Sequence, residues 1–263
     1  MRVMTFNCNG IRAAARKGFF EWLNEQSVDV VCLQETRAQL DQLTAPIFHP
    51  EQYGCHYFDA VKKGYAGTAI YCKKTPKKIS RGLGFEVADT EGRYIQVDFD
   101  NVSVASLYLP SGSSGEERQQ RKWGFMEKFM QHMQSLRNKR REFIICADWN
   151  ICHKNIDLKN WRPNQKNSGF LPEERQWLDL LYDDVGFVDA FRVVNKDEEQ
   201  YSWWSNRGQA RANNVGWRLD YHVVTPGLKK KYSVRRNLYG TELFGPCTSY
   251  NRLRFLELIH TIK

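Results

Sequence analysis

Apolar residues are grouped along the chain in short runs rich in β-branched side chains, with helical patterns between them. The runs that predict strands are RVMTFNCN, DVVCLQET, GTAIYCKK, RYIQVDFD, VSVASLYLP, EFIICADWN and LDYHVVTP. The fourth and fifth runs meet near Asp100 and Asn101, which predict a hairpin turn. A hairpin among strands that alternate with helices indicates an α/β fold with mixed rather than purely parallel sheets.

Three amphipathic segments predict helices. The second covers residues 116–137, where apolar residues recur mostly at three- and four-residue spacing, and the third begins near Pro172. The first contains Phe19, Phe20, Trp22 and Leu23. Such stripes are typical of a hydrophobic core rather than of a cofactor site. No linker, repeat or low-complexity segment interrupts them, so we expect one domain over residues 1–263.

The composition is that of a protein with a large core. The chain has 263 residues, 41% of them hydrophobic, and no run approaches the roughly 20 apolar residues of a membrane-spanning helix. The beginning, MRVMTFNCNG, is typical of a first strand rather than of a signal peptide. The seven cysteines form no CxxC pair. We therefore expect a cytoplasmic protein without disulfides and without a membrane partner.

The net charge is +9. A basic surface suits a polyanion, and nucleic acid is the main candidate partner. The charge alone does not decide between a protein that binds nucleic acid and a protein that is basic without binding it.

Polar side chains follow several of the predicted strands at the point where each strand ends. Because strand ends at one edge of a sheet lie close together, we expect these side chains to form a site. Carboxylates brought together repel each other, and carboxylate and amide oxygens suit Mg²⁺ or Mn²⁺ better than zinc. The residues concerned are Asn7, Asn9, Glu35, Tyr108, Asp148 and Asn150.

A further carboxylate, Asp220, lies inside the apolar run WRLDYHVV. An unpaired carboxylate there would be costly, so we expect another group to pair with it.

Residues 201–218, YSWWSNRGQARANNVGWR, interleave tryptophans with arginines. Aromatic rings stack on bases or sugars and arginines bind phosphates, so the segment predicts a loop that binds nucleic acid. The alternative is that the tryptophans belong to the core. The segment DLKNWRPNQKNSGF, which contains Asn167, is a similar polar and basic loop.

Several motifs occur together in one order along the chain: FNCNGIRA, LQET, GRYIQVDF, YLPSG, DWNICHKNIDLKNW, NSGF, PEERQW and NVGWRLDY. This set, which spans about residues 1–244, resembles the exonuclease III family of abasic-site endonucleases. The resemblance implies a four-layer α/β sandwich in which two mixed sheets pack face to face with helices outside. It also implies a monomeric, metal-dependent enzyme of base excision repair that cleaves duplex DNA at abasic sites, with possible 3′–5′ exonuclease activity.

The resemblance also implies roles for individual residues. Glu35 corresponds to the main metal ligand, with Asn7 beside it, and Asn9 stands where many members carry an aspartate. Asp148 corresponds to the carboxylate that activates the attacking water, and Asp220 to the one that orients a catalytic histidine. Asn150 and Tyr108 correspond to residues that bind the phosphate. The DNA-contacting set comprises Trp203, Arg207, Arg211, Trp217, Leu219 and Asn167, of which Trp203, Trp217 and Leu219 form the wall of the abasic-sugar pocket.

A second resemblance points to another function. GLGFEVADTEGRYIQVDFDNVSVASLYLPSG, KRREFIICADWN and QYSWWSN are similar to the catabolite-repression control proteins. Those proteins share the fold but repress translation together with an RNA chaperone, and their active-site positions are typically degraded. The retention of Glu35, Asp148, Asn150 and Tyr108 favours an enzyme, with an RNA-associated repressor as the alternative.

The end of the chain departs from the family pattern. After ELF the family has Ser-Asp-His and an apolar last strand, and this histidine contacts the phosphate. Here Gly245, Pro246 and Cys247 follow Phe244, and none of the six histidines takes the missing place by sequence. We therefore expect a severe loss of activity and reduced stability.

The genetic code offers an explanation for this tail. One permitted coding of residues 245–257, with the bases TC placed in front and the codons regrouped, reads Ser-Asp-His-Ala-Pro-Leu-Ile-Ile-Asp-Tyr-Asp-Phe followed by a stop. Only the middle base of each regrouped codon is largely free, so this ending is hard to obtain by chance. We interpret residues 245–263 as a frameshifted reading of a normal C-terminus, the alternative being a genuinely divergent tail.

Overall fold

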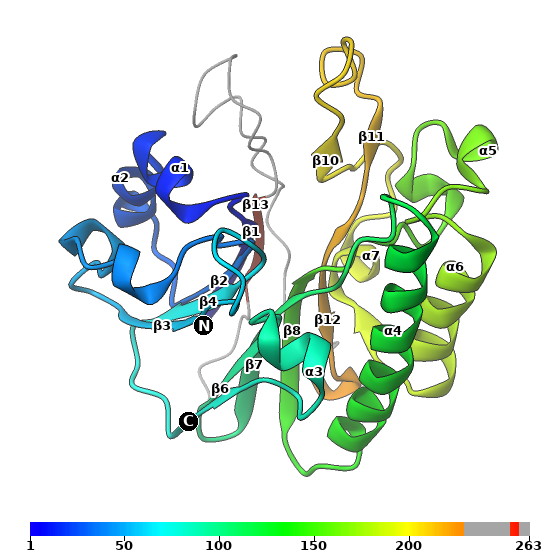
Figure 1. The fold of residues 1–263 in the computed structure, drawn as a ribbon. Helices are drawn as coiled ribbons and strands as arrows, with labels where there is room; N and C mark the ends of the chain where they lie inside the picture. Colours follow the sequence, from blue (N-terminus) through cyan, green and yellow to red (C-terminus); the bar gives the residue numbers. More distant parts are fainter. Residues whose placement is uncertain (229–252, 258–263) are drawn as a thin grey trace.

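The computed structural model describes residues 1–228 and 253–257. Two sheets pack face to face, and helices cover the outer face of each (Figure 1). The first sheet has the order β13-β1-β2-β4-β3 and the second the order β5-β6-β7-β8-β12-β9. In both sheets one strand pair is parallel, β1 with β2 and β7 with β8, and the remaining pairs are antiparallel. The predicted four-layer sandwich with mixed sheets is confirmed.

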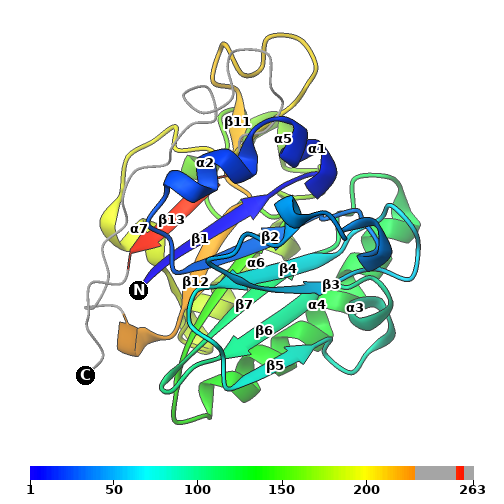
Figure 2. The same cartoon turned by 90° about the vertical axis from the view of Figure 1, so that its left-hand side faces the viewer.

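The first sheet lies beside the N-terminal helices (Figure 2). Its strands are β1 (Arg2–Asn7), β2 (Val30–Gln34), β3 (Gly54–Phe58), β4 (Thr68–Cys72) and β13 (Leu253–Glu257). The helices α1 (Ile11–Arg16) and α2 (Phe19–Glu25) cover its outer face, where Phe6, Leu33 and Phe19 share one apolar cluster. The predicted helix at Phe19 is thus confirmed as α2.

The second sheet carries the longer strands and the longest helix. Its strands are β5 (Lys78–Arg81), β6 (Tyr94–Asp98), β7 (Val102–Tyr108), β8 (Glu142–Asp148), β9 (Val188–Asp189) and β12 (Asp220–Val224). The helices around it are α3 (Glu86–Thr90), α4 (Glu116–Arg137), α5 (Trp161–Asn164), α6 (Pro172–Asp179) and α7 (Ala190–Val194). The hairpin β6-β7, helix α4 over residues 116–137 and the start of α6 at Pro172 all agree with the sequence predictions.

The core between the sheets is made of small and β-branched side chains. Val30 and Ile70 of the first sheet pack in one buried cluster with Val97, Val104 and Ile144 of the second. Strands that are buried on both faces read as continuous apolar runs, which is why most of them were predictable. The edge strands β3 and β5 were missed, because their residues are mostly exposed or half-exposed and form no continuous run of aliphatic side chains.

The segment 201–218 is not simply a loop. Strands β10 (Trp203–Trp204) and β11 (Gly216–Trp217) pair antiparallel into a ribbon that projects from the sandwich (Figure 1). The expectation of a loop was therefore wrong for its two ends, where cross-strand pairing of Trp203 with Trp217 sets the register.

Part of the unusual tail joins the first sheet. Strand β13 runs antiparallel to β1, with Phe6 opposite Leu253 and Arg2 opposite Glu257. Residues 245–252 and 258–263 of the predicted frameshifted segment lie outside the described residues. Within the described part of the chain the cysteines are all free. No helix there combines the length and apolar character needed to cross a membrane.

Candidate active site

Three polar strand ends meet between the two sheets. The amide Nδ2 of Asn7, at the end of β1, donates to Glu35 Oε1 at 3.1 Å and to Asp148 Oδ2 at 2.8 Å. Glu35 directly follows β2, and Asp148 ends β8 in the other sheet. All three side chains are buried, with Asp148 completely covered. The structure thus brings together three of the residues that the sequence placed in one site.

The backbone at two of these strand ends is held in an uncommon conformation. Glu35 has φ +53° and Asn150 has φ +49°, in the left-handed region that non-glycine residues seldom adopt. Asn150 is a residue type that tolerates this region, whereas a glutamate is strained there. Hydrogen bonds fix the turn after β8, because Asn150 N donates to Asp148 Oδ1 at 3.1 Å and Asn150 Nδ2 to the Leu109 carbonyl at 2.9 Å.

Two arginines that sequence reasoning missed approach the site. Arg37 Nη2 forms an ion pair with Glu35 Oε2 at 2.6 Å, although its side chain is 46% exposed. Arg93 is buried, and its guanidinium lies 4.8 Å from the ring centroid of Tyr108. Arg93 Nη1 also donates to the Tyr108 carbonyl at 2.9 Å. The available signal was that Arg37 and Arg93 occupy the motifs LQETR and GRYIQVDF, where a charge adjoins a buried strand.

Tyr108 ends β7 beside the carboxylates. Burial raises the pKa of its phenol well above the usual value, and the negative charge of Glu35 raises this pKa further. The positive charge of Arg93 opposes the shift without cancelling it. The raised pKa favours the protonated phenol, which can donate a hydrogen bond.

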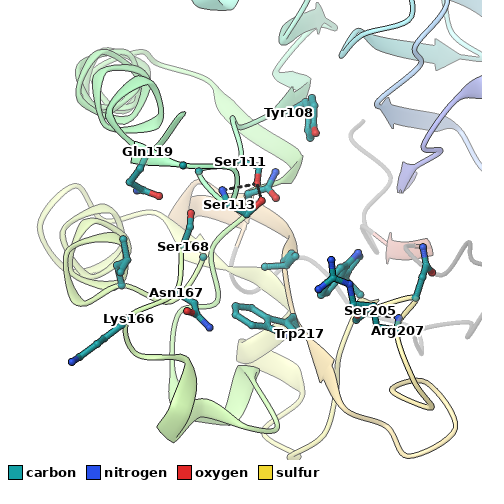
Figure 3. A pocket seen from close by; sticks show the side chains of 18 of the residues that line it. Tyr108, Ser111, Ser113, Gln119, Lys166, Asn167, Ser168, Ser205, Arg207 and Trp217 are labelled. Atoms are coloured by element: carbon teal, nitrogen blue, oxygen red, sulfur yellow. Dashed lines mark hydrogen bonds between the residues drawn. The ribbon is translucent and has the colours of Figure 1, made fainter. Parts of the chain in front are cut away.

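A pocket of about 980 Å³ opens over these groups (Figure 3). Glu35, Tyr108 and Asn150 line it, and Trp203, Trp217 and Leu219 supply an apolar wall. The rings of Trp203 and Trp217 stand edge to face, with centroids 6.3 Å apart. Polar residues cover the remaining sides, among them Ser111, Ser113, Lys166, Asn167, Ser168 and Arg207. An apolar wall facing oxygen-rich groups suits a ligand that combines a sugar with a phosphate.

Some predicted site residues do not line this pocket. Asn9 is exposed, and its backbone N–H donates to Asn7 Oδ1 at 3.0 Å. Arg211 lies with its guanidinium 5.6 Å from the ring centroid of Trp204, and Trp204 itself is buried. Asp220 lies fully buried below the pocket, where β12 places it opposite Asp148. Trp204 is thus buried in the fold, whereas Trp203 and Trp217 line the pocket and also pack against the buried side chains of Phe170 and Leu219. That this segment binds nucleic acid stays a prediction.

The two carboxylates at the strand ends bear on whether the site can hold a divalent cation. Glu35 and Asp148 supply carboxylate oxygens close enough for one amide to contact both, and a hard cation would relieve their repulsion. No group of three or more His, Cys, Asp or Glu side chains with metal-site geometry occurs in the described ranges. The residues therefore fit an oxygen-bound ion such as Mg²⁺ or Mn²⁺, held by few protein ligands, and not a zinc centre.

Comparisons with known proteins agree with this geometry. Residues 4–242 match the model of the Endonuclease/Exonuclease/phosphatase family. The chain is 41% identical to an exodeoxyribonuclease of Bacillus subtilis, over 88% of this chain and 90% of the relative. It is 36% identical to the DNA repair nuclease APEX1 of Danio rerio, over 87% of this chain and 74% of that protein. The solved structure of an AP endonuclease from Archaeoglobus fulgidus superposes with a TM-score of 0.87 at 25% identity, covering 98% of this chain and 99% of that one.

Proposed function

The chain belongs to the Endonuclease/Exonuclease/phosphatase family, and on that premise we propose that it hydrolyses phosphodiesters of duplex DNA at abasic sites. The observation that carries the proposal is the contact of one Asn7 amide with both Asp148 and Glu35, the latter lining a pocket with a tryptophan wall. The names of the similar proteins, an exodeoxyribonuclease and a DNA repair nuclease, support it. A role in base excision repair, in the cytoplasm and as a monomer, completes the proposal.

Asp148 is the proposed base that accepts a proton from the attacking water. Its Oδ2 accepts from Asn7 and its Oδ1 from the Asn150 backbone, so two hydrogen bonds hold the ionised carboxylate in one orientation. The phenol of Tyr108 stays protonated, and its O–H group donates a hydrogen bond to a phosphate oxygen. The Asn150 amide uses one hydrogen on the Leu109 carbonyl, which leaves the other for the phosphate.

Glu35 and Asn7 are the residues proposed to hold Mg²⁺ or Mn²⁺. The ion would withdraw charge from the phosphodiester as negative charge develops on its oxygens. Trp203, Trp217 and Leu219 would enclose the deoxyribose turned out of the helix, because a sugar without a base presents mainly apolar atoms. Lys166 and Arg207 at the pocket rim, together with the net charge of +9, would hold the duplex.

The test is cleavage of an abasic duplex oligonucleotide, in Mg²⁺ and in a chelator, by the form that carries Ser-Asp-His and the apolar ending after Phe244, with Asp148→Asn in that form as the comparison. We expect cleavage in Mg²⁺ only, a drop of several orders of magnitude in the variant, and nearly unchanged binding. An intact duplex serves as the control substrate. Loss of cleavage in every condition, together with binding to an RNA–chaperone complex that Asp148→Asn leaves unaltered, would favour the repressor alternative.

For the tail, we propose that residues 245–263 are a frameshifted reading that removes the histidine partner of Asp220. The burial of Asp220 opposite Asp148 supports a role for this carboxylate beside the proposed base. A form that carries Ser-Asp-His and the apolar ending after Phe244 is expected to turn over faster by several orders of magnitude, while DNA affinity changes little. Equal turnover of the two forms would contradict this, and His260 would then be the first residue to mutate.

A further inference from the structure

A buried ion pair lies behind the pocket, outside the residues to which a role has been given. Lys122 of α4 and Glu174 of α6 are both fully buried, with Lys122 Nζ 2.5 Å from Glu174 Oε1. Taking two charges out of water is expensive, and apolar residues of similar size often stabilise a fold equally well or better. The pair therefore calls for an explanation other than stability.

Both members of the pair bond to the walls of the pocket. Lys122 Nζ donates to the Asn150 carbonyl at 2.9 Å, directly at the turn that presents the Asn150 side chain. Glu174 Oε2 accepts from the backbone N–H groups of Gly169 at 2.6 Å and Leu171 at 3.0 Å. One ion pair thus links the strand end that carries Asn150 to the loop that follows Asn167.

The loop also touches the tryptophan wall. Gly169 has φ +93°, and a Cβ placed on it would lie 3.2 Å from the Asn150 carbonyl oxygen and 3.4 Å from the ring of Trp217. The backbone of Gly169 therefore lies close to both residues, and a side chain there would press against them. A small shift of the loop would move the polar side and the apolar wall of the pocket relative to each other.

We propose that the Lys122–Glu174 pair is a positioning element that sets the distance between the phosphate-binding turn at Asn150 and the Trp217 wall. Neither side chain touches the substrate. The pair acts through the Asn150 carbonyl and through the amides of Gly169 and Leu171. The part of this inference that concerns DNA rests on the proposed function, whereas the part that concerns the loop does not.

The experiment compares Lys122→Met, Glu174→Leu and the double variant with the unaltered chain. Each single variant leaves one buried charge without its partner and should unfold at a markedly lower temperature. The double variant removes both charges and should regain part of the unfolding temperature, because the Asn150 carbonyl and the N–H groups of Gly169 and Leu171 still lose their partners. If the pair serves stability alone, the properties of the pocket should recover together with the unfolding temperature. If the pair positions the pocket walls, the properties of the pocket should stay altered.

Two readouts report on the pocket under native conditions. Trypsin cleavage after the exposed Lys166 should be at least about tenfold faster in the double variant. The reason is that the backbone N–H of Gly169, three residues further along the same loop, no longer has the Glu174 carboxylate as its acceptor. The preference for abasic over intact duplex, measured as a ratio of Kd values in a chelator, should fall about tenfold as the Trp217 wall shifts. Leu136→Ala, a buried substitution in the last turn of α4, is the control for destabilisation alone.

The outcomes separate the two proposals. A double variant with a recovered unfolding temperature, the original trypsin rate and the original preference would overturn the positioning role. The same holds if Leu136→Ala reproduces both changes at equal loss of stability. An unaltered chain that neither prefers nor cleaves abasic DNA would instead contradict the proposed function, and the trypsin rate would still decide the positioning role.

Discussion

Replacing Trp217 by alanine tests whether the tryptophan wall binds DNA or only fills the fold. Trp217 is half-buried in β11 and lines the pocket, and Trp203 across the ribbon stands edge to face with it. Trp204, the neighbour of Trp203, is buried and donates through Nε1 to Asn214 Oδ1 at 3.0 Å. The ribbon therefore offers a pocket tryptophan and a core tryptophan for direct comparison.

The two substitutions should have opposite effects. Trp217→Ala removes one stacking surface, worth about 1–3 kcal/mol of binding, which raises the Kd for an abasic duplex roughly 5- to 150-fold. Its cost in stability is the edge-to-face contact with Trp203, about 0.5–1.5 kcal/mol, in addition to the packing of its half-buried ring against Phe170 and Leu219. Trp204→Ala leaves a cavity and removes the donor to Asn214 Oδ1, so it should cost about 3–5 kcal/mol of stability.

Binding is measured by fluorescence anisotropy of a labelled abasic duplex in a chelator, so that cleavage does not interfere. An intact duplex is titrated in parallel, and urea unfolding gives the stability of each variant. Because the intact duplex offers no extruded sugar, its Kd should change much less in Trp217→Ala.

The reasoning would be refuted if Trp217→Ala bound abasic DNA normally and lost as much stability as Trp204→Ala. Both tryptophans would then belong to the core. An equal loss of affinity for the abasic and the intact duplex would place Trp217 on the general DNA surface and not in a sugar pocket.

Three further predictions concern charge. Burial lowers the pKa of His132 to about 4, so protonation of this histidine favours the unfolded chain. The free energy of unfolding should therefore fall by about 2 kcal/mol between pH 7 and pH 5. Urea unfolding of the unaltered chain should show this fall, and His132→Phe should show less of it. Arg37→Ala should cost under about 1 kcal/mol of stability, because the ion pair is half-exposed, yet lower the Mg²⁺ concentration needed for cleavage, since the arginine competes for Glu35. DNA affinity should fall linearly on a log–log plot against salt concentration, and a flat plot would contradict phosphate binding.

The layers of the fold were predictable because the signals that specify them are local. A strand buried on both faces, such as β8, is a nearly uninterrupted apolar run, and α4 shows its periodicity from Phe125 to Leu136. The edge strand β5 has no such signal, because pairing with β6 holds its four mostly polar residues, Lys78–Arg81. Only the partner strand explains why this segment is extended.

The site was predictable in part for the same reason. Glu35 and Asp148 stood out as charges at the ends of buried strands, but they belong to different sheets, so their meeting depends on how the two sheets face each other. Lys122 and Glu174 lie in the charged stretches RQQRKW and PEERQW, where each reads as one surface charge among several. Their burial follows only from the packing of α4 on α6, which places each charge beside the other.

The contact of Asn7 with Asp148 joins residues 141 positions apart and crosses from one sheet to the other, so it depends on how the sheets are spaced. Close to the site a second polar contact crosses the same interface. Gln34, which precedes Glu35, donates through Nε2 to Ser106 Oγ at 2.9 Å, and Ser106 donates to the Leu33 carbonyl at 2.9 Å. All of these atoms are buried, so a slip between the sheets would leave polar groups unsatisfied at a cost of about 1–3 kcal/mol each. Apolar packing holds the sheets together without fixing their offset, whereas directional hydrogen bonds at the active-site end fix it where the carboxylates must meet.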